Sequence, residues 1–188
     1  MGRKEILGDS QKTRSAKEQG LLIAYTGDGK GKTTAALGMI FRAMGYSHKV
    51  GVVQFIKGKW KTGERRFASS FSQIDFLTLG HGFTWESEDL QIDKKMAQAA
   101  WAKSKQLIES NQYFLLVLDE ITYTFQHGFL SLDEVVQTLK LRPFQLTVVL
   151  TGRNMPDALI EMADLVTEMK LIKHPFDHGM PAKPGVDF

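Results

Sequence analysis

Glycine, lysine and threonine residues between Gly27 and Thr34 are the part of this sequence best suited to chemistry. The segment reads Gly-Asp-Gly-Lys-Gly-Lys-Thr-Thr. Closely spaced glycines allow successive backbone N–H groups to converge on an anion. Lys32 can then reach a terminal phosphate, and the Thr33 hydroxyl can bind Mg²⁺. The pattern predicts a loop that binds a nucleoside triphosphate; a flexible glycine turn is the alternative.

The residues on either side of this loop predict a strand before it and a helix after it. Residues 21–26 are a short apolar run, typical of a buried parallel strand, and residues 32–45 favour a helix. Phosphate-binding loops require this order, because the helix N-terminus adds partial positive charge. The loop is shorter than the usual pattern: three residues rather than four separate Gly27 from Gly31, and Thr26 stands at the usual glycine position.

A second strong signal is the acid pair Asp119 and Glu120, which ends the apolar run 113–118. An acid at the end of a strand beside a phosphate loop can hold Mg²⁺ directly or through water. An unpaired acid at the end of so apolar a strand would be costly. We therefore expect Thr33, Asp119 and Glu120 to form a site for Mg²⁺, with Mn²⁺ also possible; which acid contacts the metal stays open.

Two further candidate sites follow other predicted strands. Arg153 comes shortly after the apolar run 146–150 and could clamp phosphate, the alternative being a surface arginine. Phe83 and Trp85 come shortly after a predicted strand at 74–79. Large aromatic residues usually belong to the core, but ligands of doubly wound sheets bind beyond the strand ends, where these two lie.

Predicted strands and helices alternate along the whole chain. The remaining elements that we expect are a strand at 49–56, a helix at 89–110, a helix opened by a capping box at Ser131, a short helix from Pro156 and a final strand at 165–172. This alternation predicts an α/β fold, a mostly parallel sheet with helices on both faces, in the RecA-like architecture of P-loop NTPases. We assign residues 1–20 to an N-terminal arm and residues 21–188 to a single domain.

Composition excludes several other classes of site. The chain of 188 residues has no cysteine, which rules out disulfides and thiolate nucleophiles and fits a reducing compartment, so we expect a cytoplasmic protein. It shows no membrane span and no secretory signal. A net charge of +3 suits a polyphosphate ligand better than nucleic acid. His174 and His178 are poor zinc ligands, because Pro175 breaks the helix that would pair them.

Several motifs, in register and in order over residues 20–188, resemble one known family. They are Thr26–Ala36 with its short loop, Val52–Gly58, Gly63–Arg65, Gly82–Glu86, Val117–Tyr123, Thr151–Arg153 and Lys173–Asp177. The set is similar to the P-loop type ATP:corrinoid adenosyltransferases, the cob(I)yrinic acid a,c-diamide adenosyltransferase family. Ile121 and Phe188 depart from the family pattern, and neither bears on the chemistry.

The resemblance implies transfer of the 5′-deoxyadenosyl group of ATP to the cobalt of a cob(I) corrinoid, with release of tripolyphosphate, in adenosylcobalamin biosynthesis or salvage. Lys32, Arg153, Phe83 and Trp85 would serve catalysis, with the two aromatic residues on the corrin side. The expected nucleotide-binding residues are Gly27, Asp28, Gly29, Lys30, Gly31, Lys32, Thr33, Thr34, Arg42 and Arg153, of which Arg42 rests on the resemblance alone.

The resemblance also implies partners. They are a homodimer mate, whose N-terminal segment helps to cover an active site, and a reduced flavodoxin or flavoprotein as electron donor. The preferred corrinoid stays open among cobinamide, cobyrinic acid a,c-diamide and cobalamin. The alternative function is a P-loop ATPase in which Glu120 activates water. A nucleic-acid module built on the basic run 57–61 is weakly supported, because the run is short.

Overall fold

The computed structural model describes residues 19–56, 62–79 and 90–187. Its centre is a six-stranded sheet in the order β3-β2-β4-β5-β1-β6, and every pair of neighbouring strands is parallel. The strands are β1 (Leu22–Thr26), β2 (Val50–Gln54), β3 (Ile74–Thr78), β4 (Leu115–Asp119), β5 (Thr147–Thr151) and β6 (Leu165–Glu168). Residues 1–18 of the predicted arm, the basic run 57–61 and the two aromatic residues Phe83 and Trp85 lie outside the described ranges.

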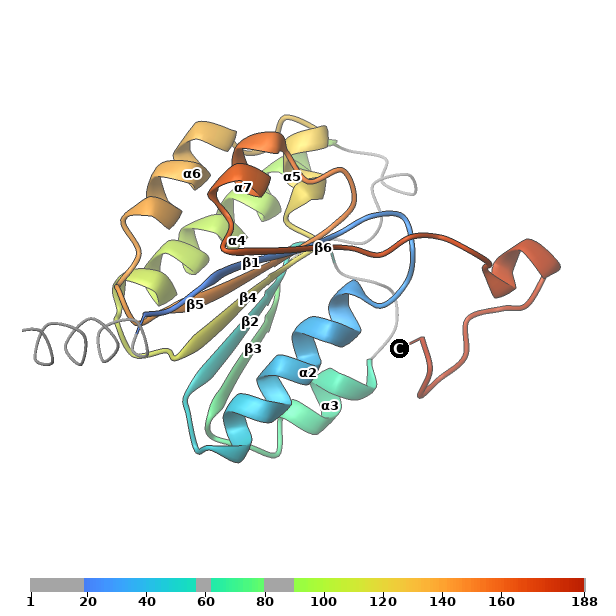
Figure 1. The fold of residues 1–188 in the computed structure, drawn as a ribbon, viewed down its shortest axis with the longest axis horizontal. Coiled ribbons are helices and arrows are strands. Elements are labelled where there is room, and N and C mark those ends of the chain that lie inside the picture. Colours follow the sequence, from blue (N-terminus) through green and yellow to red (C-terminus); the bar gives the residue numbers. More distant parts are fainter. Residues whose placement is uncertain (1–18, 57–61, 80–89, 188) are drawn as a thin grey trace, which may run out of the picture.

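Helices cover both faces of this sheet (Figure 1). One face carries α2 (Lys32–Gly45) and α3 (Gly63–Ala68), and the other carries α4 (Leu90–Glu109), α5 (Thr122–Gln126), α6 (Leu132–Lys140) and α7 (Asp157–Met162). A short 3₁₀ helix, η2 (Pro175–His178), lies in the C-terminal segment. The predicted α/β fold is confirmed. Within the described ranges, no helix is long and apolar enough to cross a membrane.

Strand residues alternate between two apolar clusters, one on each face. Val52 and Val117 pack with Ile40 of α2, while Leu116 and Leu118 pack with the helices of the opposite face. Because both faces are covered, the central strands are apolar on both sides, which is why they are short continuous hydrophobic runs in the sequence. Trp101 of α4 is 2% exposed and belongs to the core on the second face.

Two differences from the predicted elements concern the edge of the sheet and the short helices. The final strand ends at Glu168 rather than at 172, so the second half of that prediction is wrong. Beyond Glu168, Met169 donates from its N–H to the Thr26 carbonyl and accepts from the N–H of Gly29, so the chain turns to follow the phosphate loop. Helices α3 and α5, of six and five residues, were not expected, because so short a segment shows no helical period.

Candidate nucleotide and metal site

The predicted phosphate loop joins β1 to α2 and has the backbone that its glycines allow. Gly27 and Gly31 have positive φ angles of 92° and 114°, a region that other residues rarely adopt. Gly29 donates from its N–H to the Met169 carbonyl at 2.6 Å. A Cβ at Gly29 would lie 2.6 Å from that same carbonyl oxygen, so the close approach of the C-terminal chain requires glycine.

Lys32 points its ammonium group back into the loop. Its Nζ donates to the carbonyl oxygens of Gly27 and Gly29, each at 2.7 Å, and the residue is buried. Burial lowers the pKa of Lys32, and the nearby charge of Glu120 opposes that effect. The two bonds hold the amino group of Lys32 within the loop that the sequence predicts for phosphate.

Asp119 lies at the end of β4 and is buried, at 4% exposed. Its Oδ1 accepts from the hydroxyl groups of Thr33, at 2.9 Å, and of Thr151, at 2.7 Å. Its Oδ2 accepts from Nε2 of Gln54 at 3.1 Å. The predicted metal residues Thr33 and Asp119 are thus in direct contact, although 86 positions separate them in the chain.

Glu120 turns away from the strand immediately after Asp119. Its φ of 57° is unusual for a residue with a side chain, and its N–H is held by Oγ1 of Thr151 at 2.9 Å. Burial and the charge of Asp119 raise the pKa of Glu120, while Lys32 and Arg153 oppose the rise. The acid pair predicted from the sequence therefore lies beside the phosphate-loop lysine.

Arg153 lies on the same edge of the sheet, two residues beyond the end of β5. Its charge lowers the pKa of both Lys32 and Glu120, which places it within electrostatic reach of both side chains. The chain reaches Arg153 through Gly152, where φ is 145° and a Cβ would lie 2.0 Å from Oγ1 of Thr122. Glycine at 152 thus lets β5 pass close over α5 and deliver the arginine.

Asp28 is also within electrostatic reach of Lys32, and its charge opposes the lowering of the Lys32 pKa. Asp28, Lys30 and Thr34 are exposed on or next to the loop. Arg42 is exposed in the last turn of α2, about 15 Å along the helix axis from Lys32 at 1.5 Å per residue. Within one chain, the structure therefore brings Arg153 to the phosphate loop but not Arg42.

The C-terminal segment also reaches the phosphate loop, a contact that no sequence pattern predicts. Asp187 pairs with Lys30, and its Oδ2 accepts from the N–H of Lys183 at 2.8 Å. Residues 185–187 close one side of a cavity of about 300 Å³ whose other wall includes Thr33 and Thr34. The last residues of the chain thus lie against the start of α2.

The polar partners of Asp119 were also missed by the sequence reasoning. Gln54 and Thr151 bond to Asp119, Thr78 bonds to Gln54, and each is the last residue of its strand. The available signal was the same as for Asp119, namely a polar residue that closes a buried run. Uncharged polar residues commonly end strands, so this signal was not distinctive.

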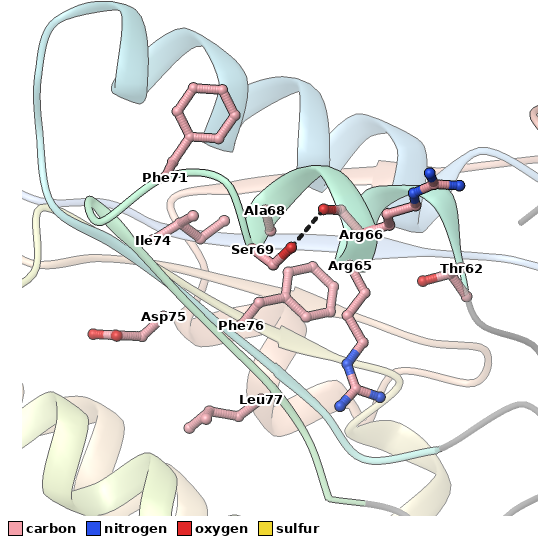
Figure 2. A pocket seen from close by; sticks show the side chains of 10 residues that line it. All are labelled: Thr62, Arg65, Arg66, Ala68, Ser69, Phe71, Ile74, Asp75, Phe76 and Leu77. Carbon is pink, nitrogen blue, oxygen red and sulfur yellow. Dashed lines mark hydrogen bonds between the residues drawn. The ribbon is translucent and has the colours of Figure 1, made fainter.

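A larger cleft of about 650 Å³ runs between α3 and the edge strand β3 (Figure 2). Its lining includes the apolar residues Phe71, Ile74 and Phe76 together with Arg65 and Arg66 of α3. The predicted site residues do not line it.

Comparison with known proteins identifies the family. The family model of the ATP:corrinoid adenosyltransferases BtuR/CobO/CobP matches residues 18–188. The chain belongs to this adenosyltransferase family. The short phosphate loop and the motifs after it are therefore those of an enzyme that transfers an adenosyl group from ATP to a corrinoid, and the ATPase alternative is not favoured.

Curated relatives of this adenosyltransferase match over nearly their whole length. The corrinoid adenosyltransferase of Pseudomonas aeruginosa is 44% identical over 189 residues, covering 100% of this chain and 93% of the relative. That of a Sinorhizobium species is 46% identical over 191 residues, with 100% and 89% covered. That of Escherichia coli K12 is 41% identical over 180 residues, with 96% and 91% covered.

A solved structure supports the architecture of the enzyme. The flagellar accessory protein FlaH from Methanocaldococcus jannaschii superposes with a TM-score of 0.52 at 10% identity, covering 85% of this chain and 76% of the other. At so low an identity, the likeness concerns the fold alone.

Proposed function

We propose that Lys32, Arg153 and the loop amides hold the triphosphate of ATP while its 5′-deoxyadenosyl group passes to the cobalt of a cob(I) corrinoid substrate. The observation that carries this proposal is the partly buried contact of Thr33, next to the loop lysine, with Asp119. It joins the first turn of α2 to the end of β4, so the phosphate loop and the acid form one unit. The family match supplies the identity of the transferred group.

The oxygen atoms at this contact fit a magnesium ion. Mg²⁺ prefers oxygen ligands and usually binds through one or two carboxylates together with substrate phosphates. The Thr33 hydroxyl and the Asp119 carboxylate supply such donors, with Glu120 beside them, and Mn²⁺ accepts the same ligand type. When bound, the ion would neutralise part of the charge of the triphosphate.

The protein does not need to supply a nucleophile for this reaction. The Co(I) centre of the substrate is itself a strong nucleophile, so its electron pair forms the bond to the 5′ carbon. The C5′–O bond breaks, and its electrons leave with the triphosphate. The loop amides, Lys32 and Arg153 stabilise the negative charge that gathers on this leaving group.

The closing experiment identifies the bond that breaks. Phosphorus NMR of a reaction with ATP, Mg²⁺ and chemically reduced corrinoid should show intact tripolyphosphate, one for each light-sensitive adenosylcorrinoid formed. ADP and orthophosphate that accumulate equally with and without corrinoid would instead identify an ATPase, with Glu120 as the residue that activates water.

We further propose that the enzyme acts as a cytoplasmic homodimer and receives electrons from a reduced flavodoxin or flavoprotein. Arg42 supports the dimer, because it is exposed and lies about 15 Å along α2 from its own phosphate loop. Arg42 would then contact the nucleotide bound by the partner subunit. Sedimentation of the free enzyme tests the dimer. The activity of an Arg42→Ala variant mixed with a Lys32→Ala variant tests whether Arg42 acts across it.

A further inference from the structure

A row of hydrogen-bonded polar side chains crosses the carboxyl ends of four adjacent strands. Gln54 of β2 is in register with Thr78 of β3 on one side and with Asp119 of β4 on the other. Thr151 of β5 follows the register pair Leu118 and Leu150 and continues the row. Register partners in a parallel sheet point to the same side, so these side chains share one face of the sheet.

That face is the one covered by α2, and along β2 it is apolar until its last level. Val50 and Val52, at the same side of β2 as Gln54, belong to the cluster that packs with α2. Gln54 is the next residue after Val52 on this face, and it places an amide where the phosphate loop meets the sheet. Such a group is costly unless both of its ends find partners.

Gln54 does find partners at both ends, and they fix its orientation. A carboxylate only accepts, so Nε2 of Gln54 must face Asp119, where it donates to Oδ2 at 3.1 Å. Oε1 of Gln54 accepts from Oγ1 of Thr78 at 3.1 Å. A rotation of the amide by half a turn would set its oxygen against the carboxylate and lose both bonds.

The amide completes the set of donors around Asp119. The other carboxylate oxygen, Oδ1, is already shared by the hydroxyl groups of Thr33 and Thr151. Among the described residues, Nε2 of Gln54 is the one hydrogen-bond donor seen at Oδ2 of this buried carboxylate. Without Gln54, only the two hydroxyl groups on Oδ1 would hold the carboxylate.

We propose that Gln54, oriented by Thr78, is a positioning residue that holds Asp119 in the geometry required for the metal-bound nucleotide. The proposal rests on the proposed role of Thr33 and Asp119 in binding Mg²⁺. It assigns Gln54 no contact with ATP itself. Its loss should therefore weaken the binding of the nucleotide with Mg²⁺ and leave the binding of the free nucleotide nearly unchanged.

The test measures binding of a fluorescent N-methylanthraniloyl derivative of ATP to the full chain, once with Mg²⁺ and once with EDTA. Gln54→Met keeps the length of the side chain and removes the amide, and Thr78→Val removes only the hydroxyl. We expect Gln54→Met to weaken binding about tenfold with Mg²⁺, the size of one hydrogen bond to a charged group, and less than about twofold with EDTA. Gln112→Met, at an exposed position, is the matched control and should change neither value.

Three results would overturn the inference: no loss in Gln54→Met, an equal loss with Mg²⁺ and with EDTA, or an additive loss in the double variant Gln54→Met/Thr78→Val. Additivity would mean that Thr78 does not act through Gln54. If Gln54→Met does not fold, as judged by its melting temperature, Thr78→Val alone decides, with the same Mg²⁺-specific loss expected at about threefold. If the wild type binds the nucleotide equally with Mg²⁺ and with EDTA, the metal role and this inference are both refuted. Release of tripolyphosphate by the wild type tests adenosyl transfer separately.

Discussion

The ammonium nitrogen of Lys32 lies 2.7 Å from the carbonyl oxygen of Gly29, inside the loop to which both residues belong. A second carbonyl, that of Gly27, accepts from the same nitrogen at 2.7 Å. Both acceptors of this ammonium group are neutral carbonyl oxygens. Phosphate oxygens are stronger acceptors for an ammonium group, so the exchange of partners favours binding.

Replacing Lys32 by alanine should lower kcat/KM for adenosylcorrinoid formation about a hundredfold or more, since a lost contact to developing charge costs about 3 kcal/mol. Lys140→Ala, at the exposed end of α6, removes the same charge far from the loop and should leave the rate unchanged. The rate is followed by the absorbance change of the corrinoid. A Lys32→Ala enzyme with near-normal kcat/KM would exclude this loop as the phosphate site.

Two glycine-to-alanine changes should shift stability in opposite directions. In Gly29→Ala the new Cβ would meet the Met169 carbonyl at 2.6 Å, so we expect a loss of about 1–3 kcal/mol. In Gly38→Ala, within α2, the Cβ meets no atom within 4 Å, and the better helix propensity should add about 0.5–1 kcal/mol. Thermal unfolding measures both, and a lower melting temperature for Gly38→Ala would contradict the open space at that position.

The raised pKa of Glu120 predicts how stability depends on pH. Because burial and Asp119 raise this pKa above the ordinary value of 4.5, the folded protein keeps a proton that the unfolded chain has lost. The free energy of unfolding should then fall as pH rises from that ordinary value through the raised pKa, and stay level above it.

Glu120→Gln stays neutral and removes this dependence. Without nucleotide, the variant should therefore unfold at a higher temperature than the wild type at about pH 8. The difference should vanish toward about pH 4, where the wild-type Glu120 carboxyl becomes protonated in the folded and in the unfolded protein. Melting curves over this range provide the measurement. A difference that does not change with pH would show that charge is not its cause.

The pair formed by Lys30 and Asp187 should compete with the nucleotide. Asp187→Asn frees Lys30, so the fluorescent ATP derivative should bind more tightly at low salt, by less than about fivefold because exposed ion pairs contribute less than about 1 kcal/mol. Asp177→Asn, in the same C-terminal segment, is the control. Weaker binding in Asp187→Asn would instead mean that the aspartate helps to build the nucleotide site.

The two aromatic residues outside the described ranges have their own prediction. If Phe83 and Trp85 remove the lower axial ligand of the cobalt, alanine at either position should reduce activity from a Co(II) corrinoid with an enzymatic reductant. Activity from chemically reduced Co(I) should fall much less. Equal losses in both assays, at an unchanged melting temperature, would argue against this role.

The parts of this site that could be predicted are those with a charge or a glycine pattern. Lys32, Thr33 and Asp119 stand in motifs whose spacing follows from phosphate and metal chemistry, and the structure brings all three together. Gln54 could not be singled out, because its importance comes from register with Asp119, and register is not visible in one strand. The contact of Asp187 with Lys30 joins residues with no periodic pattern between them.

The position of β1 in the sheet has a consequence for synthesis on the ribosome. β1 lies between β5 and β6, with Leu22 opposite Val148 and Ile23 opposite Leu165. The strand that leads into the phosphate loop is thus made before the other described strands, but its neighbours are the last to be made. A nascent chain that has not yet reached Met169 lacks the carbonyl that holds Gly29. The sheet can therefore close around β1 only after most of the chain has been made.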